Sequence, residues 1–297
     1  MPSPASQDQP TTWTTRQLLD WTAQYLEHKH VDVPRLAAEL LLGHVLETPR
    51  IKLYMDMDRP ASPLERAAFR DLVEKAVDHH PVQYLLGQAF FFSLEFEVNP
   101  DVLIPRPSTE TLVQHVIEHA RRTPGFRNPL IVDLGTGSGA IAIALAANLT
   151  DARLIATDIS EPALDVARRN AQRHGVADRI DFRLGPLFEP LAGVRAHGLV
   201  SNPPYISDAE WQQVLPNVRD YEPAHALRAG PTGTDVLSPL IAHATEYLND
   251  PGQLVVEIAA SQQQIAIDLV NQATGLTAPR VLPDHERLPR MLLADRA

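Results

Sequence analysis

The sequence predicts an α/β chain in which a small helical domain precedes a doubly wound, Rossmann-like sheet. Residues 13–85 show helical periodicity. From residue 129 onward, apolar runs of strand length alternate with helical segments, as they do in parallel sheets. A glycine-rich turn, residues 135–139, lies between the first of these strands and its helix, where doubly wound folds bind ligands.

Length and composition limit the classes of protein to consider. At 297 residues, of which 44% are hydrophobic, the chain can build two domains with a substantial core. It has no cysteine, which excludes disulfides and thiolate sites and fits a reducing cytosol. The N-terminus lacks the features of a signal peptide and no run has membrane-spanning length, so we expect a cytoplasmic protein without membrane contacts. The net charge of -11 disfavours a dedicated nucleic-acid binder and favours a protein substrate.

The helical domain is predicted over residues 13–85, after a flexible N-terminus of residues 1–12. Apolar residues recur at helical spacing over 18–26 and 36–45. A third run, 62–77, begins with a capping serine and a proline suited to the first turn. No polar group interrupts these apolar stripes, so we expect packing and partner recognition there, without chemistry.

A hairpin linker is predicted next, because residues 81–105 change to β-type alternation; we assign the linker to residues 86–105. The following helix is expected over residues 109–121, with Ser108 or Thr109 as its cap.

Residues 106–297 are predicted to form the doubly wound domain. Strands and helices alternate along it with short turns between them. Strands are expected at 130–134, 153–158, 180–184, 198–201, 253–258, 279–282 and 290–293, and helices at 140–147, 161–174, 235–248 and 261–273.

The glycine turn indicates a nucleoside cofactor, because glycines let the backbone and a helix N-terminus approach a ligand closely. It also fits the looser dinucleotide pattern, with Asp158 near the distance expected of a ribose-binding carboxylate, so a nicotinamide dehydrogenase is the rival interpretation. Three features favour S-adenosylmethionine. Asp133 would repel a pyrophosphate and attract a cationic methionine moiety, the third glycine follows after one residue, and an acceptor loop ends the fourth strand.

That acceptor loop, residues 201–205, reads Ser-Asn-Pro-Pro-Tyr and follows an apolar strand. Its prolines donate no N–H and hold the preceding residues extended. The Asn202 side-chain oxygen and the Pro203 carbonyl would then be two fixed acceptors beside the Tyr205 ring, an arrangement that suits a planar NH2 group. Hydrogen bonds from both N–H groups of a substrate amide to these two acceptors would favour a localised lone pair on the amide nitrogen and so make this nitrogen more nucleophilic. The alternative is an ordinary proline-stiffened turn.

Together these motifs resemble those of the peptide chain release factor glutamine methyltransferases. The likeness rests on residues 104–110 (IPRPSTE), 133–139 (DLGTGSG), 202–205 (NPPY) and 81–87 (PVQYLLG), and covers nearly the whole chain. It implies a class I methyltransferase sheet that binds S-adenosyl-L-methionine, releases S-adenosyl-L-homocysteine, and acts on the glutamine of a Gly-Gly-Gln loop in a release factor.

The resemblance also implies roles for individual residues. Where such methyltransferases often carry an acid and then an aromatic residue, this chain reads GPLF, so we assign the adenine contact to Leu187 and Phe188. Arg106 is either a plain surface charge or, because two prolines hold it rigidly, a residue that lines the substrate site, and we assign it to the substrate site. The catalytic and substrate-binding residues implied are Asn202, Pro203, Pro204 and Tyr205, and the further cofactor contacts are Asp133, Gly135, Thr136, Gly137, Ser138, Gly139, Asp158 and Asn202.

Other polar residues receive structural assignments. The histidines lack metal-ligand spacing, so no metal is predicted. Glu257 ends the fifth strand beside the expected cleft, where it either shapes the pocket or is solvated, and we expect the solvated position. The stretch 211–231, which contains Asp220, Glu222 and His225, either closes over the substrate or is an inert connection.

We therefore predict methyl transfer from S-adenosylmethionine to the amide nitrogen (N5) of a release factor glutamine, by direct displacement at the sulfonium. No strong base is needed, because alignment dominates and the proton can leave afterwards. The alternatives are a ribosomal protein glutamine, an adenine amine in DNA, and a non-catalytic nucleotide-binding module. The acidic charge counts against DNA. We expect a monomer whose partner is a release factor, with no direct nucleic-acid binding.

Overall fold

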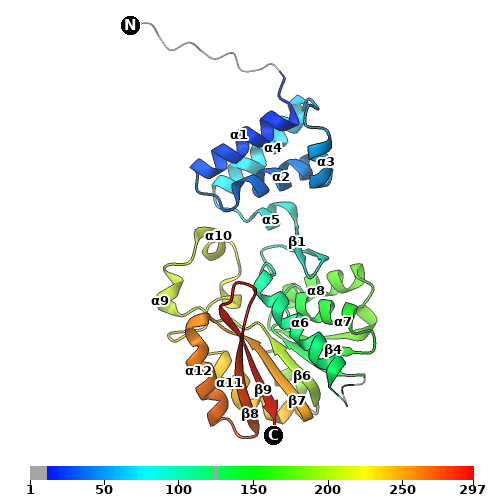
Figure 1. Cartoon of the computed structure of the whole chain (residues 1–297), viewed down its shortest axis with the longest axis vertical. Coiled ribbons are helices and arrows are strands. Elements are labelled where there is room, and N and C mark those ends of the chain that lie inside the picture. The colour runs from blue at the N-terminus through cyan, green and yellow to red at the C-terminus, as the bar shows by residue number, and fades with distance from the viewer. Residues whose placement is uncertain (1–11, 124–125, 127) are drawn as a thin grey trace. The chain divides into compact units, whose positions relative to one another are not determined.

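The computed structural model describes residues 12–123, 126 and 128–297, and these divide into two compact units between Leu86 and Gly87 (Figure 1). Each unit has its own hydrophobic core. The flexible segment predicted over residues 1–12 falls outside the described residues except for its last position. In the described part of the chain, no helix combines the length and the apolar character needed to cross a bilayer.

The N-terminal unit consists of helices, as predicted. Capping boxes begin two of them, with Thr14 and Ser62 as N-caps, and Pro63 occupies the first turn after Ser62. The β-type alternation predicted from residue 81 is wrong at its start, because the N–H groups of Tyr84 and Leu85 bond to the Pro81 carbonyl and close a helical turn. The helices are α1 (Thr15–His28), α2 (Pro34–Val45), α3 (Arg50–Met55), α4 (Pro63–Val77) and α5 (Val82–Leu86).

A two-stranded hairpin, β1 (Gln88–Phe91) and β2 (Leu94–Glu97), begins the second unit. Phe92 and Ser93 form its turn, and both have positive φ, as a two-residue hairpin of type I′ requires. The Phe92 N–H donates to a carboxylate oxygen of Glu110 at 2.7 Å. The hairpin is thereby fixed to the helix that follows it.

That helix, α6 (Pro107–Arg122), begins earlier than the sequence indicated. Arg106 is the N-cap and Pro107 takes the first helical position, so the cap predicted at Ser108 or Thr109 is wrong. Both hydroxyls instead lie in the first turn and bond to the carboxylate of Glu257. A proline at the first helical position therefore sets where α6 starts and where these two hydroxyls point.

The main sheet has seven strands in the order β5-β4-β3-β6-β7-β9-β8. The first five in that order are parallel, and β9 runs antiparallel to both of its neighbours. This confirms the doubly wound class, and the strand order reverses between β3 and β6, where such folds bind ligands. The strands are β3 (Leu130–Leu134), β4 (Arg153–Asp158), β5 (Ile180–Leu184), β6 (Ala196–Ser201), β7 (Leu248–Glu257), β8 (Leu276–Pro283) and β9 (Pro289–Arg296).

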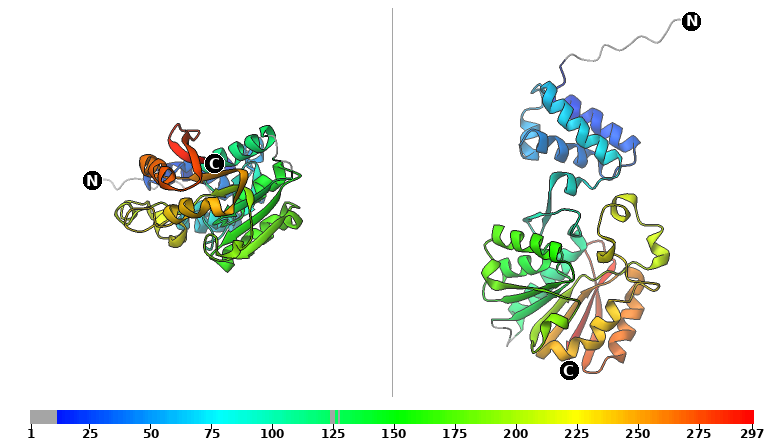
Figure 2. Two further views of the ribbon diagram at one scale, coloured as in Figure 1. Left: turned by 90° about the horizontal axis from the view of Figure 1, so that it is seen from below. Right: turned by 180° about the vertical axis from the view of Figure 1, so that it is seen from behind.

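Helices cover both faces of this sheet. α6, α7 and α8 lie over one face, and α11 and α12 over the other (Figures 1 and 2). The longer helices are α7 (Ala140–Asn148), α8 (Glu161–Arg173), α11 (Leu237–Tyr247) and α12 (Gln263–Gln272), and the short ones are η1 (Ala177–Arg179), η2 (Glu189–Leu191), α9 (Asp208–Trp211), α10 (Pro216–Arg219), η3 (Ala224–Ala226) and η4 (Ala260–Gln262).

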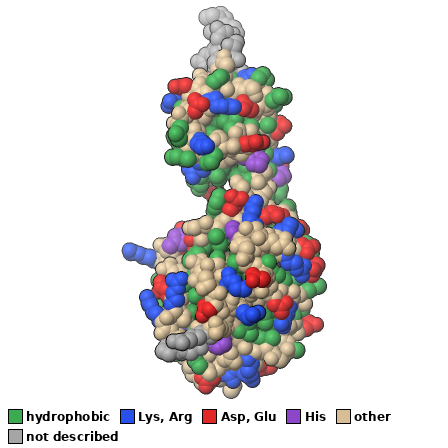
Figure 3. Space-filling view, turned by 90° about the vertical axis from the view of Figure 1, so that its right-hand side faces the viewer, with side chains coloured by type: hydrophobic (Ala, Val, Ile, Leu, Met, Phe, Trp, Pro, Cys, Tyr) green, Lys and Arg blue, Asp and Glu red, His purple; other side chains and the backbone are tan. Residues whose placement is uncertain are grey.

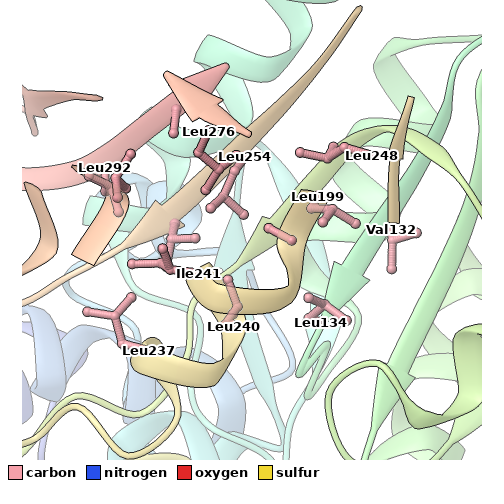
Figure 4. Packing of buried hydrophobic residues seen from close by; sticks show 14 of the residues in the cluster. Val132, Leu134, Leu199, Leu237, Leu240, Ile241, Leu248, Leu254, Leu276 and Leu292 are labelled. Carbon is pink, nitrogen blue, oxygen red and sulfur yellow. The ribbon is translucent and has the colours of Figure 1, made fainter. Parts of the chain in front are cut away.

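Apolar packing between the sheet and α11 fixes the scaffold of this unit. Leu240 and Ile241 of α11 pack with Leu199 and Leu254 of the sheet, all at most 1% exposed (Figure 4). Such burial stabilises by about 1.5–3 kcal/mol per large aliphatic side chain. The ends of β3 and β6, which lead into the glycine turn and the acceptor loop, are therefore held in place by a well-packed core.

Charged side chains lie over this scaffold in mixed order. On the face shown in Figure 3, acidic and basic side chains are interspersed in each unit. The overall balance is 37 acidic against 26 basic residues.

Candidate active site

The carboxyl ends of four parallel strands line one cavity of about 310 Å³. Gly135 follows β3, Asp158 ends β4, Gly185 follows β5 and Asn202 follows β6. We call this space the glycine-loop cavity. Its volume lies at the lower end of the range of about 300–1,000 Å³ that is typical of small-ligand sites. Further lining comes from Asp101, Val102, Leu103, Leu134, Gly137, Ile159, Ala163, Pro186, Leu187, Ser201, Pro203, Pro204, His225, Ala226, Asp235 and Val236.

Backbone hydrogen bonds hold the glycine turn in place at this edge of the sheet. The N–H groups of Gly135 and Thr136 both donate to the Thr157 carbonyl at 2.9 Å. Gly139 has a φ of +83°, and a Cβ built on it would lie 2.8 Å from the Ile143 side chain and 3.1 Å from that of Ala167. Only glycine allows this turn to pack so closely on α7 and α8.

Asp133 supports the turn from behind and does not line the cavity. Its carboxylate is fully buried and accepts from the Thr136 hydroxyl at 2.6 Å and the Ala142 N–H at 3.2 Å. Burial raises the pKa of this carboxyl to about 7. The expectation that Asp133 attracts a cation by direct contact is therefore corrected: its side chain shapes the loop.

The other residues of the turn divide in the same way. Gly135 and Gly137 line the cavity, whereas Thr136, Ser138 and Gly139 are not among its lining residues. The Ser138 carbonyl accepts from the side chain of Asn170, which also bonds to both backbone groups of Glu97 in β2. These contacts tie the hairpin and α8 to the turn.

Asp158 lines the cavity and is only 9% exposed. One of its oxygens accepts from the Gly137 N–H at 2.8 Å and the other from the Ser160 N–H at 2.9 Å. Each oxygen keeps a further lone pair for a ligand. The side chain thus holds the glycine turn and faces the space beside it.

The two residues assigned to the adenine contact lie in different surroundings. Leu187 lines the cavity, in a backbone conformation with a φ of +42°. Phe188 is 7% exposed and stacks on Tyr247, with ring centroids 4.5 Å apart, inside the core. In this structure Phe188 therefore supports the wall that Leu187, Ile159 and Pro186 provide.

The acceptor loop stands between the glycine-loop cavity and a second cavity of about 240 Å³. Pro203 and Pro204 line the first, and Tyr205 lines the second, which we call the Tyr205 cavity. Burial raises the pKa of the Tyr205 phenol. The Tyr205 cavity is lined by Leu103, Arg106, Asn202, Tyr205, Ile206, Val218, Ala226 and Leu227, and it shares Leu103, Asn202 and Ala226 with the first.

Behind the loop, the Asn202 amide is held by residues that the sequence did not single out for this role. Its Nδ2 donates to the Thr109 hydroxyl at 3.1 Å, and that hydroxyl donates to Glu257 at 2.6 Å. The other Glu257 oxygen accepts from the Ser108 hydroxyl at 2.9 Å. Glu257 is 2% exposed, so the solvated position predicted for it is wrong, and burial raises the pKa of its carboxyl.

Arg106 lines the Tyr205 cavity, where it pairs with a buried acid. Its Nη2 donates to Glu222 at 2.5 Å, and the second oxygen of Glu222 accepts from the Ile104 N–H at 3.1 Å. Glu222 is 5% exposed. The connection between β6 and α11, residues 206–236, is thus bonded to the segment before α6 and places His225 and Ala226 against the glycine-loop cavity.

Gln262 fixes the loop from the opposite side. Its side-chain NH2 donates to the Tyr205 carbonyl at 3.2 Å and to the Gly233 carbonyl at 2.7 Å, while its side-chain oxygen accepts from the Ala259 N–H. No local motif marks this role, because Gln262 is one of three consecutive glutamines that open a helix and such a run is typical of a solvent-exposed surface. Only the folded structure shows that Gln262 contacts Tyr205 and Gly233.

Comparison with known proteins identifies the family of the chain. A family model described as "PrmC N-terminal domain" matches residues 17–87, and one described as "Methyltransferase small domain" matches residues 107–218. A release factor glutamine methyltransferase of Chlorobaculum tepidum is 42% identical over 286 residues, 94% of this chain and 96% of that protein. The chain belongs to the release factor glutamine methyltransferase family.

A second relative supports this membership, and a solved structure shows the same fold. The release factor glutamine methyltransferase of Geobacter sulfurreducens is 41% identical over 89% of this chain and 91% of its own length. Among solved structures, the hMettl16 catalytic domain in complex with an RNA hairpin superposes with a TM-score of 0.54 over 69% of this chain and 76% of that one. At 14% identity it shows the fold alone. The resemblance drawn from the motifs is confirmed, and the chain is a methyltransferase.

Proposed function

We propose that this enzyme transfers the methyl group of S-adenosyl-L-methionine to the side-chain amide nitrogen (N5) of the glutamine in the Gly-Gly-Gln motif of a class-1 peptide chain release factor. The observation that supports this most directly is the position of Asn202 where the glycine-loop cavity and the Tyr205 cavity meet. A methyl donor in the first and an amide in the second would react beside this side chain. The names of the relatives support the same substrate.

The residues of the glycine-loop cavity fit S-adenosylmethionine. Gly135 and Gly137 leave room for close approach, and Asp158 offers lone pairs to ribose hydroxyls. Ile159 and Leu187 supply apolar walls for a flat base. When bound, the cofactor supplies an electrophilic methyl group on a sulfonium.

The acceptor loop would bind and orient the substrate amide. Asn202 Oδ1 and the Pro203 carbonyl accept its two N–H bonds, and the Tyr205 ring flanks it. Held this way, the nitrogen lone pair points toward the glycine-loop cavity. As the N–CH3 bond forms and the S–CH3 bond breaks, the nitrogen becomes acidic and releases a proton to water, so alignment does most of the catalysis.

In this proposal, one domain carries out catalysis and the other recognises the protein substrate. Residues 106–297 bind the cofactor and the glutamine, with Arg106 lining the space that the glutamine enters. The helical domain, residues 13–85, recognises the release factor, and residues 86–105 link the two. The partner is a protein, the enzyme works as a monomer, and no direct nucleic-acid contact is required.

The test compares wild type with Asn202→Ala, using a purified release factor, labelled methyl donor and mass spectrometry of the product. Wild type should methylate the Gly-Gly-Gln glutamine. Asn202→Ala should lower turnover by about a hundredfold or more, because an acceptor at the reacting group is lost, while the affinity for S-adenosylhomocysteine changes little.

A matched control is Asn249→Ala, which removes another asparagine side chain that donates a hydrogen bond, to the Arg195 carbonyl. It should leave turnover unchanged. Near-normal turnover in folded Asn202→Ala would refute the mechanism, and methylation of a ribosomal protein or of DNA in place of the release factor would refute the substrate.

A further inference from the structure

Three side chains form a hydrogen-bonded chain behind the reacting group. Asn202 Nδ2 donates to Thr109 Oγ1, and Thr109 Oγ1 donates to Glu257 Oε2. Thr109 is 4% exposed and Glu257 is 2% exposed, so bulk water does not compete for these bonds. Only Asn202, the outermost member, reaches the two cavities.

The fold builds this chain from three separate elements. β6 and β7 are parallel, with Ser201 level with Val256, so Asn202 and Glu257 follow side by side. Pro107 at the first position of α6 places Thr109 in the first turn, where its hydroxyl reaches between them. The two hydrogen bonds are long-range: Asn202 and Thr109 are 93 positions apart in the sequence, and Thr109 and Glu257 are 148 positions apart.

The number of protons available determines the direction of the hydrogen bonds between Asn202, Thr109 and Glu257. Both oxygens of Glu257 accept hydrogen bonds, from the Ser108 and Thr109 hydroxyls, and in its ionised form this carboxylate has no proton to give. Thr109 therefore uses its single proton on Glu257 and offers only lone pairs to Asn202. The NH2 end of the Asn202 amide must face Thr109, since the opposite orientation would set an oxygen against lone pairs.

We propose that Thr109 and Glu257 are positioning residues that hold the Asn202 amide with Nδ2 inward and Oδ1 toward the substrate. The proposal rests on the function proposed above, in which Oδ1 accepts an N–H of the substrate glutamine. A reversed Asn202 would present its own N–H groups to the substrate NH2, donor against donor. The orientation of Asn202 Oδ1, the acceptor on which methyl transfer depends, is therefore determined by Thr109 and Glu257, which do not touch the substrate.

The test measures methylation of a purified release factor by Thr109→Val and Thr109→Ser. Valine matches threonine in shape but frees the Asn202 amide to rotate, so kcat should fall by about tenfold to a hundredfold with KM and S-adenosylhomocysteine affinity nearly unchanged. Serine keeps the hydroxyl and should restore kcat to within about threefold of wild type. Thr109→Ala replaces valine in the test if the valine variant does not fold.

A double-mutant cycle separates positioning from mere stability. If Thr109 acts through Asn202, then Thr109→Val added to Asn202→Ala should lower kcat by no more than about twofold further. Thr245→Val is the matched control, because this threonine also lies on a helix and donates its hydroxyl to a backbone carbonyl, of Thr274. It should lower stability slightly and leave kcat unchanged.

Each outcome has a distinct meaning. An active wild type with normal kcat in Thr109→Val overturns the positioning proposal and leaves the proposed function intact. Equal losses in the valine and serine variants, additive with Asn202→Ala, also overturn it, since a structural role explains them. A wild type that does not methylate the release factor contradicts the proposed function itself.

Discussion

At the scale of single residues, Asp133 makes the stability of the enzyme depend on pH. Burial raises its pKa from 3.8 to about 7 in the folded chain. Well below pH 3.8 the carboxyl is protonated in both the folded and the unfolded chain, and no penalty arises. As pH rises from 4 to 7 the unfolded chain loses its proton first, so folding loses free energy, and a shift of three units corresponds to roughly 4 kcal/mol.

The measurement compares the unfolding free energies of wild type and Asp133→Asn at several pH values. Asparagine keeps an acceptor for Thr136 and Ala142 but does not titrate in this range. Wild type should therefore lose stability relative to the variant between pH 4 and 7, and the difference should level off above pH 8. A difference that is constant across this range would show that Asp133 is not buried as described.

The sequence predicted site residues where a local motif determined them. The glycines at 135 and 137, Asp158 and the loop 202–205 all line the two cavities, because each follows a strand whose end the sequence marks. The hydrogen bonds through which Thr109, Glu257 and Gln262 support the site were not predicted, for a common reason. Their roles come from partners far away in the chain, and a glutamate at a strand end looks the same whether water or two hydroxyls face it.

At the scale of elements, local pattern predicted the first three parallel strands well and the short helices poorly. The strands at 130–134, 153–158 and 180–184 match the structure residue for residue. The first two are largely buried apolar runs between turns, whereas the third, β5, is a partly exposed edge strand that ends at Gly185. The helices α3 and α5 were not predicted, because six and five residues are too few to show a period. For the stretch 211–231 the sequence left two roles open, closure over the substrate or an inert connection, and the structure adds that Glu222 within it bonds to Arg106 and Ile104.

Glu222→Gln tests whether this connection depends on its ion pair. The variant keeps an acceptor for the Ile104 N–H but loses the charge opposite Arg106. Because Glu222 is buried and Arg106 is partly exposed, we expect a loss of about 1–3 kcal/mol in unfolding free energy, with a raised KM for the release factor.

Glu161→Gln is the matched control, since its pair with Arg168 is exposed. That change should cost less than about 0.5 kcal/mol and leave KM unaltered. Equal effects from the two variants would mean that the buried pair does not hold the connection.

At the scale of the whole molecule, the two units have separate cores and separate predicted tasks. Residues of both cavities lie between Asp101 and Val236, within the unit that begins at Gly87. The helical unit packs its own cluster around Leu19, Leu41 and Phe69. Unfolding is therefore expected in more than one step, so a single melting temperature does not describe the whole chain.

This division predicts what a truncated chain of residues 87–297 can still do. Its core and its cavity lining are complete, so it should fold and bind S-adenosylhomocysteine with an affinity within about threefold of that of the full chain, since every lining residue of the glycine-loop cavity is retained. If the helical unit recognises the release factor, KM for that substrate should rise by about tenfold or more, because a loss of 1.4 kcal/mol of binding is a factor of ten. Calorimetric titration and initial-rate measurements give both numbers. An unchanged KM would remove the recognition role from the helical unit, whereas loss of cofactor binding would show that the glycine-loop cavity depends on residues before Gly87.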